Sequence, residues 1–148
     1  MERKEKMKKS LAFLISVFLI FLTACGGAKD TGTAYTEVNV EEGITLTLEE
    51  DTLKSSRATF LLANNTEEAV NYSTNEYHFE QMNDGQWKEF TGTAESNWGD
   101  ETSVLEAGEE IALSYNWKTF CGATTEGTQY RLIIMVNDSP VAAEFTGI

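Results

Sequence analysis

The chain has 148 residues, of which 11 are basic and 24 acidic, so its formal net charge at pH 7 is −13. This length allows one domain with its own core. The charge excludes nucleic acid as an expected partner, because such binding depends on cations that neutralise phosphates.

The first 24 residues have the anatomy of a secretory signal. A basic start, MERKEKMKKS, precedes an apolar block of 12 residues from Leu11 to Leu22. This block is too short to cross a bilayer as a helix, which takes about 20 residues. A basic start, a short apolar core and small residues after it predict a signal peptide over residues 1–24.

The end of this segment resembles the lipobox of bacterial lipoprotein precursors, in the run Leu22, Thr23, Ala24 and Cys25. The resemblance implies that cleavage leaves Cys25 as the first residue and that its thiol carries a diacylglycerol. Two acyl chains hold a protein stably at a membrane, whereas one chain holds it only marginally. We therefore expect a lipid anchor on the outer face of the bacterial cytoplasmic membrane. The alternative is an ordinary secretory signal whose cleavage site lies beside a cysteine.

Removal of residues 1–24 leaves six basic and 22 acidic residues, a net charge of −16. This balance argues against adsorption to anionic head groups, and it leaves open the capture of a cation or a cationic peptide by the acidic surface. Acylation of Cys25 also predicts that the chain has no disulfide framework. Cys121 is then a small apolar filler, a reduced thiol or an intermolecular link.

Residues 25–40 are predicted to be the lipidated cysteine and a flexible tether, because GGAKDTGTAY is small and polar without periodicity. After the tether, apolar and polar residues alternate between turn signals, which predicts β-strands. Asn83-Asp84-Gly85 predicts a hairpin turn, since these residues tolerate positive φ. The alternation places strands at 44–48, 57–63, 77–81, 87–90, 104–105, 111–117, 130–136 and 141–145.

About seven or eight short strands without a convincing amphipathic helix predict an all-β fold, an antiparallel sandwich or barrel over residues 41–148. The strand from Tyr130 to Val136 is apolar on both faces, so we expect it to be central or covered twice. His78, the only histidine of the chain, alternates with aromatic residues and is predicted at the surface or at a sheet edge.

Two segments resemble the bacterial immunoglobulin-like domains found in surface lipoproteins of Gram-positive bacteria. The first is EEDTLKSSRATFLLANN with the following Tyr-rich and Glu-bearing strands, the Asp-Gly turn and Trp87. The second is LEAGEEIALSYNW followed by GTQYRL, which resembles the family's Leu-x-x-Gly-Glu turn, Trp-ended strand and Gly-x-x-Tyr-Arg strand. The resemblance covers roughly residues 44–136. It implies an immunoglobulin-like β-sandwich and brings no catalytic residues.

The same motifs imply structural roles for five residues. Gly127 and Tyr130 are expected to form a tyrosine corner, in which the phenol bonds upstream backbone. Gly108 is expected to permit the positive φ of a tight turn. Trp87 and Trp117 are expected to be large anchors of the core.

The chain carries no motif for hydrolysis or for cradling phosphate. We therefore expect no enzyme activity, no cofactor and no bound metal. Trp98 is the strongest candidate binding residue, because it stands in the polar stretch ESNWGD where no alternation demands it. The alternative is that Trp98 folds back over the sandwich edge. Phe120 and Cys121 form a second candidate patch.

Three functions remain open. The leading one is a non-catalytic, lipid-anchored module that contacts a protein or an envelope glycan. The second is proteinase inhibition, since the Asn-Asn strand end, the Gly-Glu turn and the Gly-x-Tyr strand also resemble the intracellular-type proteinase inhibitor domain. In that case WKTFCGATTEG would be the segment presented to the protease. The third is the capture of a cation or a cationic peptide.

Overall fold

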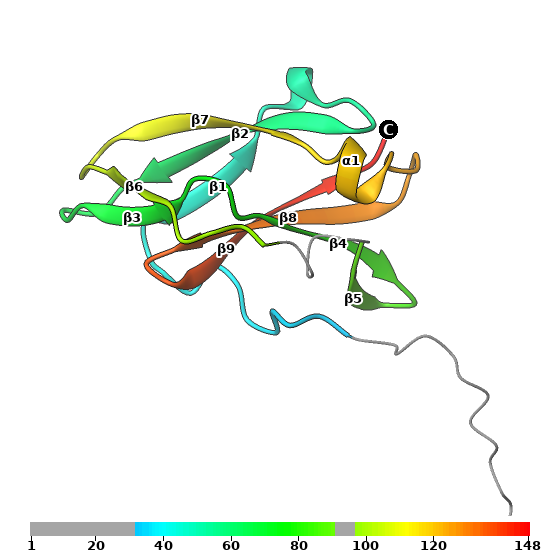
Figure 1. The fold of residues 1–148 in the computed structure, drawn as a ribbon, viewed down its shortest axis with the longest axis horizontal. Helices are drawn as coiled ribbons and strands as arrows, with labels where there is room; N and C mark the ends of the chain where they lie inside the picture. The colour runs from blue at the N-terminus through cyan, green and yellow to red at the C-terminus, as the bar shows by residue number, and fades with distance from the viewer. Residues whose placement is uncertain (1–31, 91–96) are drawn as a thin grey trace, which may run out of the picture. The chain divides into compact units, whose positions relative to one another are not determined.

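A computed structural model describes residues 32–90 and 97–148 of the chain. In this part, nine strands form two antiparallel sheets (Figure 1). The predicted antiparallel β-sandwich is therefore confirmed. The predicted signal peptide, with the lipobox residues Leu22, Thr23, Ala24 and Cys25, lies outside the described residues.

The smaller sheet has three strands in the order β1, β2, β7, with bounds β1 Ile44–Leu48, β2 Arg57–Asn64 and β7 Glu110–Asn116. A 3-10 turn, η1 (Glu50–Thr52), lies between β1 and β2. Because side chains alternate along a strand, Phe60 and Leu62 are fully buried in the core. Thr59 and Leu61, which alternate with them, lie on the outer face of the sheet.

The larger sheet has six strands, with β5, β4, β8, β3 and β6 in order and β9 paired to β8. β8 is hydrogen-bonded along both edges, and its side chains from Tyr130 to Val136 are buried on both faces except for the partly buried Met135, as its apolar sequence predicts. The β4–β5 hairpin turns through Asp84 and Gly85, whose φ values of 51° and 76° are those of the predicted turn type. The bounds are β3 Val70–Ser73, β4 His78–Asn83, β5 Gln86–Glu89, β6 Thr102–Leu105, β8 Gln129–Val136 and β9 Ser139–Thr146.

The core between the sheets is centred on stacked aromatic rings. Phe79 stacks on Trp117 with 4.7 Å between ring centroids and on Tyr130 with 5.5 Å. Trp117 is fully buried, and its indole N–H donates to the carbonyl of Ser55. The hydroxyl of Tyr130 accepts the N–H of Thr125 at 2.9 Å, which is the bonding of a tyrosine corner.

Two glycines allow the turns beside this core. Gly127 has a φ of 80° and donates its N–H to the carbonyl of Gly147 beside the tyrosine corner. Gly108 has a φ of 74°, and its N–H donates to the carbonyl of Asn64. Side chains rarely adopt such backbone angles, so glycine suits both positions.

Asn64 ties the end of β2 to the segment between β6 and β7. Its side chain is fully buried and donates to the carbonyls of Leu105 and Glu106, each at 3.1 Å. Its side-chain oxygen accepts from both the N–H and the hydroxyl of Thr66. The Asn-Asn strand end is therefore a structural junction between the two sheets.

The outer face of the larger sheet carries a buried ion pair. Arg131 of β8 and Glu80 of β4 lie opposite each other in register and approach to 2.6 Å, with side chains 4% and 1% exposed. Trp87 covers the guanidinium, with 4.6 Å from its Cζ to the ring centroid. The prediction that Trp87 is a core anchor is therefore wrong: its position in β5 puts the half-buried ring on the outer face, over Arg131.

Residues 32–40 cover the same face, and we call them the N-terminal strap. Thr33 donates its hydroxyl to Glu80 and its N–H to the carbonyl of Trp87. The carbonyl of Tyr35 accepts from Arg131 at 2.9 Å. Further along, Asn39 exchanges hydrogen bonds with both backbone groups of Ala142. Residues that the sequence assigns to a flexible tether thus hydrogen-bond to the sheet.

The strap also explains the position of His78. The sequence predicts His78 at the surface or at an edge, but its side chain is buried, so this prediction is wrong. Its ring lies 5.0 Å from the ring of Tyr35, and its Nε2 lies 2.8 Å from a carboxylate oxygen of Glu76. The strap covers part of the outer face of β4. Alternation of residues within β4 cannot predict this cover.

We predict that Arg131→Met destabilises the fold by about 3–5 kcal/mol, because it leaves the Glu80 carboxylate buried without its cation. The double variant Arg131→Met, Glu80→Met removes both charges and should recover most of that loss. Urea unfolding followed by tryptophan fluorescence measures both. Lys118→Met, at an exposed position, serves as the control and should change stability by about 0.5 kcal/mol or less. Equal stability of Arg131→Met and wild type would contradict a structural role for the pair.

Candidate functional site

Trp98 and Phe120, which the sequence singles out separately, lie together in the structure. Their ring centroids are 5.3 Å apart, and both contact Tyr77, Trp98 at 5.0 Å and Phe120 at 6.4 Å. We call Tyr77, Trp98 and Phe120 the aromatic patch. It joins the start of β4, the loop before β6 and the helical turn after β7, three segments that are distant along the chain.

The patch stands on a rigid base. Tyr77 is buried and packs on Tyr115 of β7, with ring centroids 5.0 Å apart. Tyr115 in turn packs on Phe60 of the core. Trp98 is half-buried and folds onto Tyr77, whereas Phe120 remains 42% exposed. The patch is therefore the outer end of a column of aromatic rings that is continuous with the core.

Cys121 lies beside the patch at the end of α1 (Lys118–Cys121) and packs half-buried against the core. Its N–H donates to the carbonyl of Trp117 at 2.7 Å, which closes the helical turn. Thr124 then donates its N–H to the carbonyl of Ser55. The segment from residue 117 to 127 is thus a helical turn followed by an anchored loop. A helix of four residues is too short to give a periodic pattern, so the sequence does not predict α1.

Burial shapes the chemistry of the tyrosines here. Burial, with the neighbouring Cys121 thiol as a smaller cause, raises the pKa of Tyr77 to about 12. Burial also raises the pKa of Tyr35 to about 12, with added effects from the carboxylates of Glu76, Glu89 and Glu80. These phenols stay protonated over the physiological range and act as neutral aromatic surface.

Two buried polar atoms border the patch. The hydroxyl of Tyr115 and the Nδ1 of His78 have no hydrogen-bond partner within the described part of the chain. The His78 ring lies 6.4 Å from Trp98. Buried polar groups are normally hydrogen-bonded, so these two atoms are exceptions within the described part of the chain.

Two further properties concern the described residues alone. No group of three or more His, Cys, Asp and Glu side chains among residues 32–90 and 97–148 is placed to hold a metal ion. Within the same ranges, no helix has the length and apolar character needed to cross a membrane.

Comparison with known families agrees with the architecture. A family model described as bacterial Ig-like domain matches residues 40–146, which is most of the chain and includes all nine strands of the described sheets. A search of curated proteins found no match. Domains of this kind are typically non-enzymatic, which agrees with a site built from aromatic rings rather than from an acid–base pair.

We predict that stability falls as pH rises from about 10 to about 12. In the folded state the pKa of Tyr77 is about 12, above the value near 10 of an unfolded tyrosine. The unfolded state therefore ionises first, and the stabilisation present below pH 10 is lost as pH approaches 12. Urea unfolding at pH 9, 10, 11 and 12 measures this dependence.

Tyr77→Phe should give a shallower alkaline loss than wild type, because one of the shifted groups is gone. Gln129, exposed on β8, offers a control: Gln129→Ala should leave the alkaline slope unchanged. An identical slope in wild type and Tyr77→Phe would contradict burial of the Tyr77 phenol.

Proposed function

The chain belongs to the bacterial Ig-like domain family, and we propose that it is a lipid-anchored, extracytoplasmic protein whose sandwich is a non-catalytic binding domain. The contact surface in this proposal is the aromatic patch. Its convergence from separate segments onto one buried base is the observation that carries the proposal. Aromatic side chains are enriched at protein interfaces, where a few well-packed residues supply most of the affinity.

The geometry of the patch favours a protein over an envelope glycan. The planes of Trp98 and Phe120 are inclined by 55°, and those of Tyr77 and Trp98 by 49°. Rings inclined in this way do not share one flat face, which is the surface on which a sugar ring stacks best, so the patch suits the side chains of a protein better. Acidic residues adjoin the patch in sequence, with Asp100 and Glu101 exposed after Trp98. A partner with a basic rim would complement this charge.

The N-terminal strap supports a position close to the membrane. If Cys25 is the lipid anchor, seven Cα–Cα steps separate it from Gly32, which forms a β-bridge with Lys88 of β5. Seven residues span at most roughly 25 Å. With the strap held on the sheet, the effective tether is therefore short, and the domain would contact partners at the membrane face rather than far from it.

The alternative functions receive less support from the described residues. A protease cleft binds an extended backbone, whereas the segment proposed as an inhibitory loop is a helical turn at Lys118–Cys121. Cation capture requires grouped carboxylates, and no such group with metal-binding placement occurs in the described ranges. Binding of a cationic peptide remains compatible with the acidic rim of the patch.

We predict that Phe120→Ala lowers partner recovery at least fivefold when the tagged protein is pulled down from intact envelopes. Phe120 is exposed, so its truncation removes contact area with little effect on the core. Val104→Ala, at an apolar position on β6 that is more exposed than Phe120, is the matched control and should recover the partner as wild type does. Unchanged recovery with both Phe120→Ala and Trp98→Ala would remove the patch from the proposal. If a soluble glycan releases the partner, we would conclude that the patch binds a saccharide rather than a protein.

We predict that Cys25→Ala abolishes membrane attachment through lipid, because no thiol remains to carry the diacylglycerol. The variant should stay uncleaved or be released into the medium. Fractionation, combined with mass spectrometry of the amino-terminal peptide, measures this. Cys121→Ala is the control and should retain the lipid-modified amino terminus. A processed, lipid-labelled Cys25→Ala protein in the membrane fraction would refute the lipoprotein assignment.

A further inference from the structure

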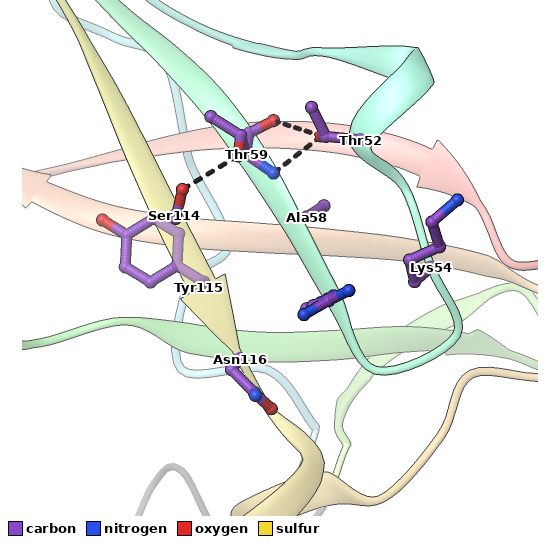
Figure 2. A pocket seen from close by; sticks show the side chains of 8 residues that line it. Thr52, Lys54, Ala58, Thr59, Ser114, Tyr115 and Asn116 are labelled. Carbon is purple, nitrogen blue, oxygen red and sulfur yellow. Dashed lines mark hydrogen bonds between the residues drawn. The ribbon is translucent and has the colours of Figure 1, made fainter.

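A groove lies on the outer face of the smaller sheet and shares no residue with the aromatic patch. It is an open groove of about 510 Å³ beside β2 and β7 (Figure 2). Its lining residues are Thr52, Lys54, Arg57, Ala58, Thr59, Ser114, Tyr115 and Asn116. No acidic residue is among them in the described part of the chain, although acidic residues greatly outnumber basic ones overall.

Two cations face this groove without a counter-ion. Lys54 and Arg57 are both exposed, and neither forms an ion pair or a side-chain hydrogen bond with any described residue. They stand three residues apart, on either side of the tight turn in which their backbones hydrogen-bond to each other. Figure 2 shows Lys54 on this turn, across β2 from Asn116 of β7. Two positive charges without an ion pair among the described residues therefore line this groove of an otherwise acidic domain.

Two donors remain available among the other polar groups of the groove, the Asn116 amide and one hydroxyl of the Thr59–Ser114 pair. Asn116 lies opposite Arg57 in register, and its side-chain oxygen already accepts the N–H of Lys118, which leaves the amide NH₂ to donate. The hydroxyls of Thr59 and Ser114 bond to each other at 2.9 Å, and one hydrogen of the two is left over. The hydroxyl of Thr52 donates to the carbonyl of Glu49 and accepts the N–H of Thr59.

We propose that this groove binds an oxyanion, a phosphate or a carboxylate carried on a hydroxylated compound such as a polyol or a sugar. Arginine forms two parallel hydrogen bonds to either group, and lysine adds a point charge. A surface that offers donors and two positive charges requires a ligand made of acceptors with negative charge. The hydroxyl pair and the Asn116 amide then suit the hydroxyl oxygens that flank the anion.

The test uses the full chain in neutral detergent micelles and isothermal titration calorimetry. Glycerol 3-phosphate and glucuronate are the probes, and glycerol at the same concentration is the neutral control. We expect one or both anions to bind with a Kd of about 1 mM, since the groove is open and shallow. We expect no heat from glycerol. Repeating the titration with phosphatidylglycerol in the micelles separates the sources, because a lipid headgroup that occupies the groove weakens the soluble probe.

Arg57→Gln and Lys54→Gln should each weaken the binding roughly tenfold, the effect of losing a charge-assisted pair of bonds. Lys88→Gln removes the same charge from β5 of the other sheet and should change the Kd less than twofold. Arg57 is exposed, so an unchanged melting temperature verifies the fold of its variant. Absence of binding by both anions, or equal weakening by all three substitutions, would overturn the proposal.

Discussion

The burial of the Arg131–Glu80 pair is the constraint on which the rest of the larger sheet depends. Two charges removed from water carry a desolvation penalty of several kcal/mol each, which their attraction offsets only if the remaining hydrogen-bonding groups are also satisfied. Here the additional bonds come from Thr33 and Tyr35, and Trp87 covers the guanidinium. The pair thus joins β4, β5, β8 and the strap into one unit.

This dependence changes the meaning of the amino-terminal segment. A polar stretch without periodicity is ordinarily a linker, and residues 32–40 contain nothing apolar enough to form a core of their own. Their contribution is to supply hydrogen-bonding groups at a buried charge and at the free edge of β9. The strap is therefore held by these hydrogen bonds together with the packing of the Tyr35 ring on His78, and its hydrogen-bond partners Arg131 and Ala142 lie about 100 positions away in sequence.

The sequence predicts those parts of the fold that depend on local patterning. Alternation correctly locates β2, β7 and β8, and the Asn-Asp-Gly turn locates the β4–β5 hairpin. The strands placed by alternation do not include β3 (Val70–Ser73). Alternation misplaces His78 and Trp87 because residues distant in sequence pack on them: Tyr35 and Trp98 on His78, and Arg131 on Trp87. Packing of distant residues on a strand face depends on tertiary structure, so alternation within the strand does not predict it.

The candidate site, too, could be predicted from the sequence only in part. Trp98 and Phe120 each stand out from their polar surroundings, so the sequence identifies them as individual residues. Their contact, and the column of rings beneath them, depend on bringing the start of β4 beside the end of β7. In a strongly acidic chain the few cations are informative in a similar way. Arg131 is buried in an ion pair with Glu80, whereas Lys54 and Arg57 are exposed and line the groove. The two cations that line this groove lie beside side-chain donors, and this combination is what the anion-binding proposal rests on.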